Sequence, residues 1–174
     1  MGKSISTPST SIIVTTYNRP DALRLSLESM LRQTVAPDEI IVADDGSTCD
    51  TRAVVEALAG KSGIPVLHVW QEDRGFRLSA IRNKAIARAS GDYILQVDGD
   101  VLLGRHFVSD HLELAERGFF VCGSRVRLSP EVTRRVLSDE HFRPTLFNMP
   151  LSFAANSLRS RLLRHWMATR YGRR

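Results

Sequence analysis

Two patterns of hydrophobic residues, one typical of strands and one typical of helices, alternate along the first 125 residues of the chain. Short runs rich in β-branched residues, such as Ser11–Thr16 and Glu39–Ala43, are typical of buried strands. Between these runs, apolar residues recur every three or four positions, as in Asp21–Arg32, which is typical of amphipathic helices. The pattern therefore predicts a chain in which strands and helices take turns.

The predicted elements define a fold class. Strands are expected at Ser11–Thr16, Glu39–Ala43, Pro65–Trp70, Tyr93–Val97 and Phe119–Arg125. Helices are expected at Asp21–Arg32, at Asp50–Ala59 closed by Gly60, at Ser79–Ala89 with Ile81, Ala85 and Ile86 inward, and near His106–Arg117. Strand–helix–strand repeats indicate βαβ units, so we predict an α/β fold with a mostly parallel, Rossmann-like sheet flanked by helices.

Polar side chains follow three of these strands where each strand ends. Thr15 to Asn18 end the first strand, Asp44 and Asp45 the second, and Asp98 and Asp100 the fourth. Right-handed crossovers bring the carboxyl ends of parallel strands to one edge, where open α/β sheets bind their ligands. We therefore expect one polar site along this edge.

The turn Asp98-Gly99-Asp100 sets two carboxylates one glycine apart. Like charges at this spacing repel, and a hard divalent cation such as Mg²⁺ or Mn²⁺, carrying a phosphorylated ligand, would relieve the repulsion. The alternative is a solvated acidic turn, since Asp-Gly is common turn chemistry. A calcium-binding EF-hand is excluded because Val101 to Leu103 follow the turn in place of oxygen ligands.

The remaining candidates lie in two segments. Asp44 or Asp45 is expected to bind a base or a ribose, or else only to form a turn. Arg77, Arg82 and Asn83 lie where they could grip a phosphate or ribose. The glycine-rich phosphate loops of ATPases and dinucleotide-binding enzymes are absent from the sequence, which leaves phosphate neutralisation to a metal.

Two further side chains in the third strand are interpreted as packing residues. His68 alternates with apolar neighbours, and Trp70 ends the same strand. We expect Trp70 to be a packing residue and not a stacking platform.

Composition and charge narrow the class of protein to which the chain can belong. The chain has 174 residues, 43% hydrophobic and 25% charged, as in one globular domain. Residues 1–140 carry 17 basic and 19 acidic residues, a balance of −2, whereas residues 141–174 carry seven Arg and no acid. Because the folded body lacks a basic array, we expect no nucleic-acid partner. Two distant cysteines and no secretory leader predict a cytoplasmic setting.

Four segments carry a family resemblance: "SIIVTTYNRPDALRLSLESMLRQT", "EIIVADDGSTCDT", "GFRLSAIRNKAIARASGDYILQVDGD" and "VCGSRV". Together, from Ser11 to Val126, they resemble family 2 glycosyltransferases, and "QEDRGFRLSAIRNKAI" is particularly similar to the chondroitin-polymerase-like branch. The resemblance implies a GT-A nucleotide-sugar-binding fold, a UDP-sugar donor, Mn²⁺ or Mg²⁺, and inverting transfer to a glycan or lipid-linked acceptor in polysaccharide biosynthesis.

The resemblance also implies roles for individual residues. It places Thr15, Tyr17 and Arg19 near the nucleotide, Asp44 or Asp45 on the base, and Arg77, Arg82 and Asn83 around the ribose and diphosphate. By the same resemblance, Asp98 approaches the ribose and the metal, and Asp100 is the direct metal ligand of the Asp-x-Asp motif.

The sequence departs from the family after residue 128. No Asp or Glu follows Glu140, so no catalytic base is assigned. We expect a flexible tail over residues 1–10, a donor-binding domain over residues 11–128, and a helical basic segment over residues 129–174 that stops before an acceptor half. A predicted amphipathic helix at Ser157–Arg170 would contact either an anionic membrane at its inner face or that missing acceptor half.

Three other classes compete with the glycosyltransferase reading. A non-catalytic nucleotide-sugar-binding or assembly partner fits the missing base. A haloacid-dehalogenase-type phosphatase needs a nucleophilic Asp after the first strand, where this chain has Thr15-Thr16-Tyr17-Asn18. Nucleotidyltransferases need a glycine-rich first loop, which the chain lacks. Metal-dependent UDP binding would separate the first class from the phosphatase.

Overall fold

The structure is a computed structural model in which residues 7–139 are described. The chain divides into two compact units, Met1–Val121 and Cys122–Arg174. The first unit contains β1 (Thr10–Thr16), α1 (Pro20–Leu31), β2 (Glu39–Asp44), α2 (Cys49–Ala59), β3 (Val66–Trp70), α3 (Leu78–Ile86), β4 (Tyr93–Asp98) and α4 (Phe107–Leu114). The predicted domain boundary after residue 128 stays a prediction.

The second unit contributes one described helix, α5 (Pro130–Ser138). Ser129 caps it by accepting the amide N–H of Val132 at 3.3 Å, and Pro130 occupies the first helical position. The predicted helix at Ser157–Arg170 lies outside the described residues. No helix within residues 7–139 has the length and apolar content to cross a membrane.

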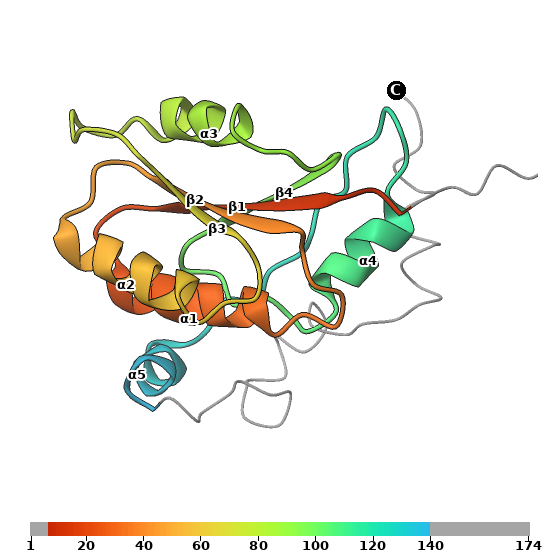
Figure 1. Cartoon of the computed structure of the whole chain (residues 1–174). Helices are drawn as coiled ribbons and strands as arrows, with labels where there is room; N and C mark the ends of the chain where they lie inside the picture. Colours follow the sequence, from red (N-terminus) through yellow and green to blue (C-terminus); the bar gives the residue numbers. More distant parts are fainter. Residues whose placement is uncertain (1–6, 140–174) are drawn as a thin grey trace, which may run out of the picture. The chain divides into compact units, whose positions relative to one another are not determined.

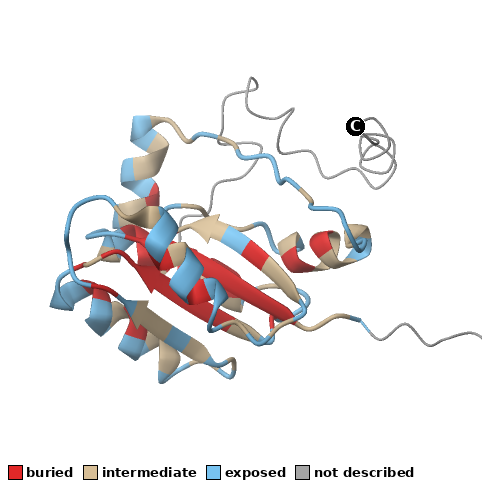
Figure 2. Ribbon diagram, turned by 90° about the horizontal axis from the view of Figure 1, so that it is seen from above, coloured by how far each residue is buried: buried red, intermediate tan, exposed pale blue. Residues whose placement is uncertain are grey.

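The sheet has four parallel strands in the order β3-β2-β1-β4. Val14 of β1 pairs with Val42 of β2 on one side and with Val97 of β4 on the other. β1 is buried along its whole length, because it lies centrally and is covered on both faces (Figure 2). The parallel sheet and its flanking helices confirm the predicted fold class.

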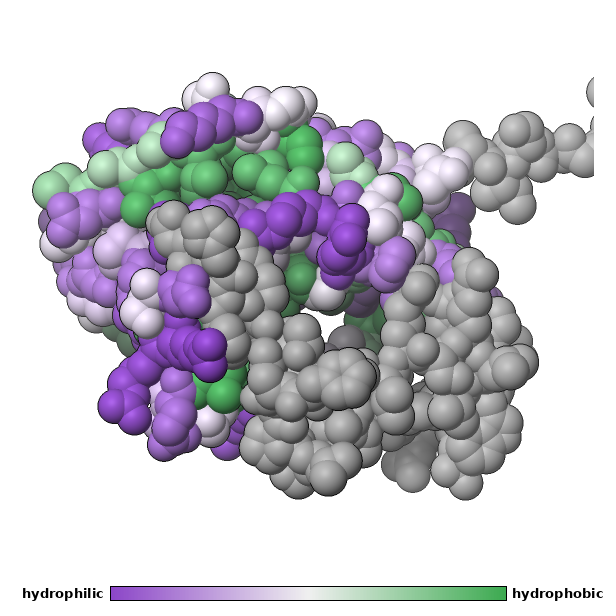
Figure 3. All heavy atoms as spheres, turned by 90° about the horizontal axis from the view of Figure 1, so that it is seen from below, coloured by the Kyte–Doolittle hydropathy of each residue, from purple (hydrophilic) through white to green (hydrophobic). Residues whose placement is uncertain are grey.

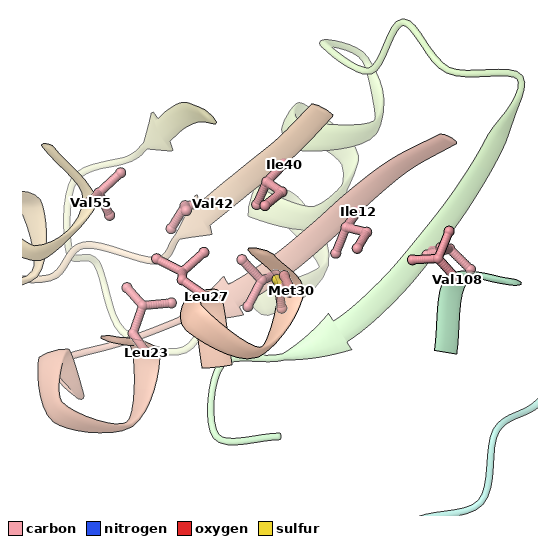
Figure 4. Close-up of a cluster of buried hydrophobic side chains, with 10 residues drawn as sticks. Ile12, Leu23, Leu27, Met30, Ile40, Val42, Val55 and Val108 are labelled. Carbon is pink, nitrogen blue, oxygen red and sulfur yellow. The ribbon is translucent and has the colours of Figure 1, made fainter. Parts of the chain in front are cut away.

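Helices cover both faces of the sheet (Figure 1). On one face, side chains of α1, α2 and α4 pack against the strands. Figure 4 shows Leu23, Leu27 and Met30 of α1 facing Ile12 of β1 and Ile40 of β2. This larger core cluster consists of Ile12, Val14, Leu23, Leu27, Met30, Ile40, Val42, Val55, Leu95 and Val108.

On the other face, α3 is the helix within residues 7–139 that packs against the strands. Its Ile81 and Ala85 are fully buried against Ile13, Ile41 and Ala43. Figure 3 views the molecule from below, on the side opposite α3, and the described residues on that surface are hydrophilic beside hydrophobic. The sheet is therefore a middle layer, and its carboxyl edge lies between the two helical layers.

Three carboxylates secure the opposite, amino-terminal edge of the sheet. Oε1 of Glu39 accepts hydrogen bonds from Ser11 Oγ at 2.6 Å, Ser90 N at 2.6 Å and Ser90 Oγ at 2.9 Å. Burial acts to raise the pKa of Glu39, but these hydrogen bonds outweigh it and hold the pKa below its ordinary value. Asp92 accepts from Ser9, which lowers the pKa of Asp92 as well. Asp38 accepts from Thr10 N at 2.7 Å.

Several sequence predictions were wrong in detail. The segment Phe119–Arg125 is not a strand: Phe119 and Phe120 are 53% and 86% exposed, and the segment follows a turn at Gly118, with φ +87°. A strand needs a neighbouring backbone, and none of the four described strands pairs with this segment in the sheet. α3 ends at Ile86, not Ala89. Ile86 is 37% exposed although its neighbour Ala85 is buried against the sheet, because successive helical residues point in directions about 100° apart.

Candidate functional site

Gly99 lets β4 end in contact with β1. The amide of Gly99 donates to the carbonyl of Thr15 at 2.7 Å, which extends the pairing of the two strands by one bond. A Cβ at residue 99 would lie 2.6 Å from that same carbonyl oxygen, a distance that real Cβ atoms do not tolerate. Only glycine fits here, and the two flanking carboxylates leave the strand at this point.

The two carboxylates of the turn have different surroundings. Oδ1 of Asp98 accepts from Nη2 of Arg82 at 2.8 Å and from Oγ1 of Thr15 at 3.3 Å, so residues of β1, α3 and β4 meet there. Asp100 is exposed, and within residues 7–139 its carboxylate has no hydrogen bond or ion pair. Asp100 is therefore free to bind a ligand, whereas Asp98 is already partly neutralised.

The donor set of this turn fits a hard divalent cation in part. Two carboxylates supply oxygen ligands, which Mg²⁺ and Mn²⁺ prefer. Among residues 7–139 no three His, Cys, Asp or Glu side chains are grouped to hold an ion by themselves. A cation at Asp98 and Asp100 would take its other ligands from water and from a phosphorylated ligand, the usual arrangement for Mg²⁺.

The buried Ser26 and Ser29 of α1, together with Gln33 just after the helix, form a polar seam that holds the loop following Asp100. Oγ of Ser26 donates to the carbonyl of Val101 at 2.8 Å, and Oγ of Ser29 accepts from the amide of Leu103 at 2.9 Å. Nε2 of Gln33 donates to the carbonyl of Gly104 at 2.8 Å. We did not predict this seam, although its polar residues at helical spacing on an apolar helix were a readable signal.

Asp44 is a buried structural anion. It is 1% exposed, and Oδ1 accepts from the amide of Ser47 at 2.8 Å while Oδ2 pairs with Nε2 of His68 at 2.9 Å. Burial acts to raise the pKa of Asp44, but the hydrogen bonds from His68 and Ser47 outweigh it, so the pKa lies below its ordinary value. His68, interpreted from sequence as a packing residue, instead pairs with this carboxylate.

Hydrogen bonds join the loop after β1 to the turn after β2. The amide of Asn18 donates to Oγ of Ser47 at 2.9 Å, and the amide of Thr48 donates to Oδ1 of Asn18 at 3.0 Å. Asn18 has φ +48°, a left-handed conformation that residues other than glycine rarely adopt. Nε1 of Trp70 donates to the carbonyl of Ser47 at 3.1 Å, so Trp70 also binds this turn.

Asp45 faces the segment that follows β3. Its Oδ1 accepts from Nε2 of Gln71, and its Oδ2 accepts from the amide of Arg77 at 2.8 Å. Gln71 is 4% exposed and was missed by the sequence reading, because nothing in the sequence marks it as a partner of Asp45. A Cβ at Gly46 would lie 2.6 Å from the backbone of Asp73, so the two segments touch directly.

A pocket opens beside Asp45. It is lined by Tyr17, Asp45, Gly75 and Phe76. The hydroxyl of Tyr17 donates to Oδ2 of Asp73 at 2.8 Å, and this carboxylate raises the pKa of Tyr17. Tyr17 is 50% exposed and Phe76 is 88% exposed, so two aromatic rings meet solvent around a buried carboxylate.

Not all of the predicted site residues share contacts. Thr15 and Arg82 both bond to Asp98, and Tyr17 lines the pocket with Asp45. The amide of Arg77 donates to Asp45, while its Nη2 donates to the carbonyl of Glu72. Two other predicted residues stand apart: Arg19 is exposed and pairs with Asp21 at 3.4 Å, and Asn83 is exposed on α3.

Unpartnered polar atoms gather at this edge. Among the described residues, five buried side-chain atoms lack a hydrogen-bond partner, and four of them belong to Thr16, Gln71, Arg77 and Arg82. Such atoms are rare in folded proteins, and each calls for an explanation such as an ion or water that completes it. Their concentration marks the carboxyl edge as the functional candidate.

A family model described as "Glycosyl transferase family 2" matches residues 11–172. Validoxylamine A glucosyltransferase of Streptomyces hygroscopicus subsp. limoneus is 36% identical over 113 residues, which cover 64% of this chain and 24% of that protein. Hyaluronan synthase of Pasteurella multocida is 40% identical over 92 residues, covering 52% and 9%. Chondroitin synthase of Escherichia coli is 33% identical over 105 residues, covering 60% and 15%. The matched part of the chain thus spans less than a quarter of the length of each of these three relatives.

Solved structures share the fold. The mannosyltransferase PcManGT of Pyrobaculum calidifontis, in complex with GDP-Man and Mn²⁺, has a TM-score of 0.59 at 24% identity, covering 76% of this chain and 39% of that one. Residues 1–349 of S. aureus TarS, in complex with UDP-GlcNAc, have a TM-score of 0.51 at 30% identity, covering 59% and 29%. These similarities confirm the GT-A fold predicted from the sequence.

Proposed function

Because the chain belongs to glycosyl transferase family 2, we propose that its carboxyl edge binds the nucleoside diphosphate of a sugar donor. The observation that carries this proposal is the pairing of two features on one edge. One is the Asp98-Gly99-Asp100 turn, in which the carboxylate of Asp100 has no partner among residues 7–139, and the other is the aromatic pocket over Asp45. Within the proposal, residues 11–128 are the donor-binding domain and residues 129–174 a basic segment.

We assign the base to the pocket at Tyr17 and Asp45. Both aspartates of the second strand were candidates, but Asp44 is 1% exposed and does not line the pocket, whereas Asp45 does. A carboxylate has about four acceptor sites, so Asp45 can still accept an N–H of a base beside its two protein donors. TarS has a complex with UDP-GlcNAc, which supports uracil as the base and a UDP-sugar as the donor.

The diphosphate belongs at the Asp98-Gly99-Asp100 turn. Asp100 would hold a Mn²⁺ or Mg²⁺ ion directly, and Asp98, oriented by Arg82, would approach the ion and the ribose. When bound, the ion acts as a Lewis acid on the departing diphosphate. Arg77, Arg82 and Asn83 supply donors for the ribose and diphosphate, and Thr15 and Arg19 lie on the neighbouring segment.

The reaction itself is an inverting transfer of the sugar to an acceptor hydroxyl. The relatives named hyaluronan synthase and chondroitin synthase support a glycan or lipid-linked acceptor and a role in polysaccharide synthesis. The residue that deprotonates the acceptor is not assigned. The competing function, a binding or assembly partner without catalysis, shares the donor site and lacks the transfer step.

Two measurements test the proposal in order. Calorimetry of the full chain with UDP, with and without Mn²⁺, should show binding that the metal strengthens. No binding of UDP, GDP or another nucleoside diphosphate under either condition would contradict the proposal. Where UDP binds, incubation with labelled UDP-sugars and candidate acceptors separates the transferase from the binding partner, because only the transferase forms a labelled glycan.

A further inference from the structure

The turn after β2 is held by two side chains of the edge strand β3. His68 and Trp70 are two residues apart, so both lie on one face of the strand. Nε2–H of His68 donates to Oδ2 of Asp44 at 2.9 Å, and Nε1–H of Trp70 donates to the carbonyl of Ser47 at 3.1 Å. Since the amide of Ser47 donates to Asp44 at 2.8 Å, the turn is fixed at both of its ends.

The turn after β2 also fixes the loop after β1. Oγ of Ser47 accepts the amide of Asn18 at 2.9 Å, and Asn18 returns a bond by accepting the amide of Thr48 at 3.0 Å. These two bonds stabilise the left-handed backbone of Asn18, at φ +48°. Tyr17, directly before Asn18, lines the pocket, so the direction in which its ring leaves the backbone depends on this linkage.

The members of this chain of contacts lie outside the pocket lining. Asp44 is 1% exposed and Ser47 is 8% exposed, and neither side chain lines the pocket as Tyr17 and Asp45 do. Asp44 and Ser47 can therefore affect a nucleotide bound there only through their neighbours. Asp44 also needs a donor, because a buried carboxylate without a partner is strongly unfavourable. The side chain of His68, 15% exposed, supplies that donor.

We propose that His68 is a positioning residue of the nucleotide pocket, acting through Asp44 and Ser47 to orient Asn18 and Tyr17. The inference rests on the proposed function of the Tyr17–Asp45 pocket and names a residue outside it. The role needs only an N–H at the position of Nε2, which a neutral imidazole or a glutamine amide can provide.

The test compares two substitutions of the full chain that differ in this donor. His68→Leu removes the N–H, and His68→Gln keeps an amide N–H of similar reach. We expect His68→Leu to weaken UDP binding by about tenfold, the effect of losing one hydrogen bond to a charged group. His68→Gln should bind UDP within about twofold of the unsubstituted chain, a difference below one ordinary hydrogen bond. Leu67→Ala, at a 37% exposed side chain on the opposite face of β3, is the matched control and should leave affinity unchanged.

A second readout needs no nucleotide. The amide proton and nitrogen resonances of Asn18 and Ser47 should shift in His68→Leu and return toward their original positions in His68→Gln. If both His68 variants weaken UDP binding equally, or if His68→Leu lowers only the unfolding temperature, the positioning role is wrong. Trp70→Phe, which removes the other bond to Ser47 at an exposed ring, should show the same amide shifts if His68→Leu does not fold.

The outcomes also separate this inference from the proposed function. If the unsubstituted chain binds no nucleoside diphosphate, the proposed function fails. If it binds UDP and none of the variants at His68 or Trp70 changes either the affinity or the Asn18 and Ser47 resonances, only the positioning inference fails.

Discussion

The amide of Gly99 donates to the carbonyl of Thr15 at 2.7 Å, and the same carbonyl oxygen would lie 2.6 Å from a Cβ at residue 99. The approach of β4 to β1 therefore depends on the absence of a side chain. Because Asp98 and Asp100 flank this residue, the contact also sets where both carboxylates emerge.

Gly99→Ala should weaken metal-dependent UDP binding while the chain stays folded. The added methyl group has to push the end of β4 away from Thr15, which displaces both carboxylates. We expect at least a tenfold loss of UDP affinity in Mn²⁺, corresponding to about 1.4 kcal/mol. Calorimetry measures the loss, and Gly63→Ala, where a Cβ meets no atom within 4 Å, is the matched control. Equal affinities in the two variants would show that the contact does not position the carboxylates.

Asp100→Asn should abolish the enhancement of UDP binding by Mn²⁺. The substitution keeps the shape of the side chain and removes the charge of a carboxylate that has no partner among residues 7–139. UDP affinity without metal should stay the same or rise, since the substitution removes a carboxylate that repels the diphosphate. Titrations with and without Mn²⁺ check both parts, and an enhancement as large as that of the unsubstituted chain would refute the metal assignment.

Asp45→Ala should weaken UDP binding more than Asp44→Ala does. Asp45→Ala removes a group that lines the pocket, so we expect UDP binding to weaken by about 1–3 kcal/mol. Because Asp45→Ala also leaves Nε2 of Gln71 and the amide of Arg77 without their acceptor, the unfolding temperature should fall. Asp44→Ala leaves His68 and the amide of Ser47 without their acceptor, so it should lower stability as well. Scanning calorimetry and UDP titration of both variants provide the comparison. A larger loss of affinity in a fully stable Asp44→Ala would reverse the assignment.

Glu39 should make the free energy of unfolding depend on pH in the acid range. Its folded pKa lies below its ordinary value, so the carboxylate stabilises the fold at a pH above its unfolded pKa of about 4.3. This contribution is lost as the pH falls through the folded pKa. Glu39→Gln should therefore lower stability at pH 7 and flatten its dependence between about pH 5 and pH 2.

Urea unfolding at a series of pH values measures this dependence. Glu56→Gln, on the exposed side of α2, is the control and should keep the slope of the unsubstituted chain. If Glu39→Gln shows that same slope, the hydrogen bonds from Ser11 and Ser90 do not depend on the charge of Glu39.

Most strands and helices of the first unit were predictable, because the spacing of hydrophobic residues along the sequence follows from which side chains are buried. The four strands β1 to β4 lie within one residue of their predicted bounds, and α2 ends before Gly60 as expected. The polar residues at the carboxyl ends were predictable for the same reason, since parallel strands end at one edge. Phe119–Arg125 failed because an apolar run shows that a segment is able to form a strand, without showing that a neighbour pairs with it.

The partners of the site residues were not predictable. His68 pairs with Asp44 across 24 positions because β3 lies beside β2 in one particular register. Gln71 bonds Asp45 across 26 positions, and Ser29 bonds Leu103 across 74. A residue pattern shows which side chains are inside, but contacts of this kind depend on the three-dimensional register of strands and loops.

The strand order β3-β2-β1-β4 has a consequence for synthesis on the ribosome. The first three strands pair with neighbours in sequence, whereas β4 pairs with β1 across 83 positions from Thr15 to Asp98. A nascent chain that ends before residue 98 holds the aromatic pocket residues Tyr17 and Phe76 and lacks the whole Asp98-Gly99-Asp100 turn. The fourth strand therefore completes the four-stranded sheet and the ligand site in one event. A ligand that contacts both the aromatic pocket and the Asp98-Gly99-Asp100 turn binds only the finished domain and so stabilises it.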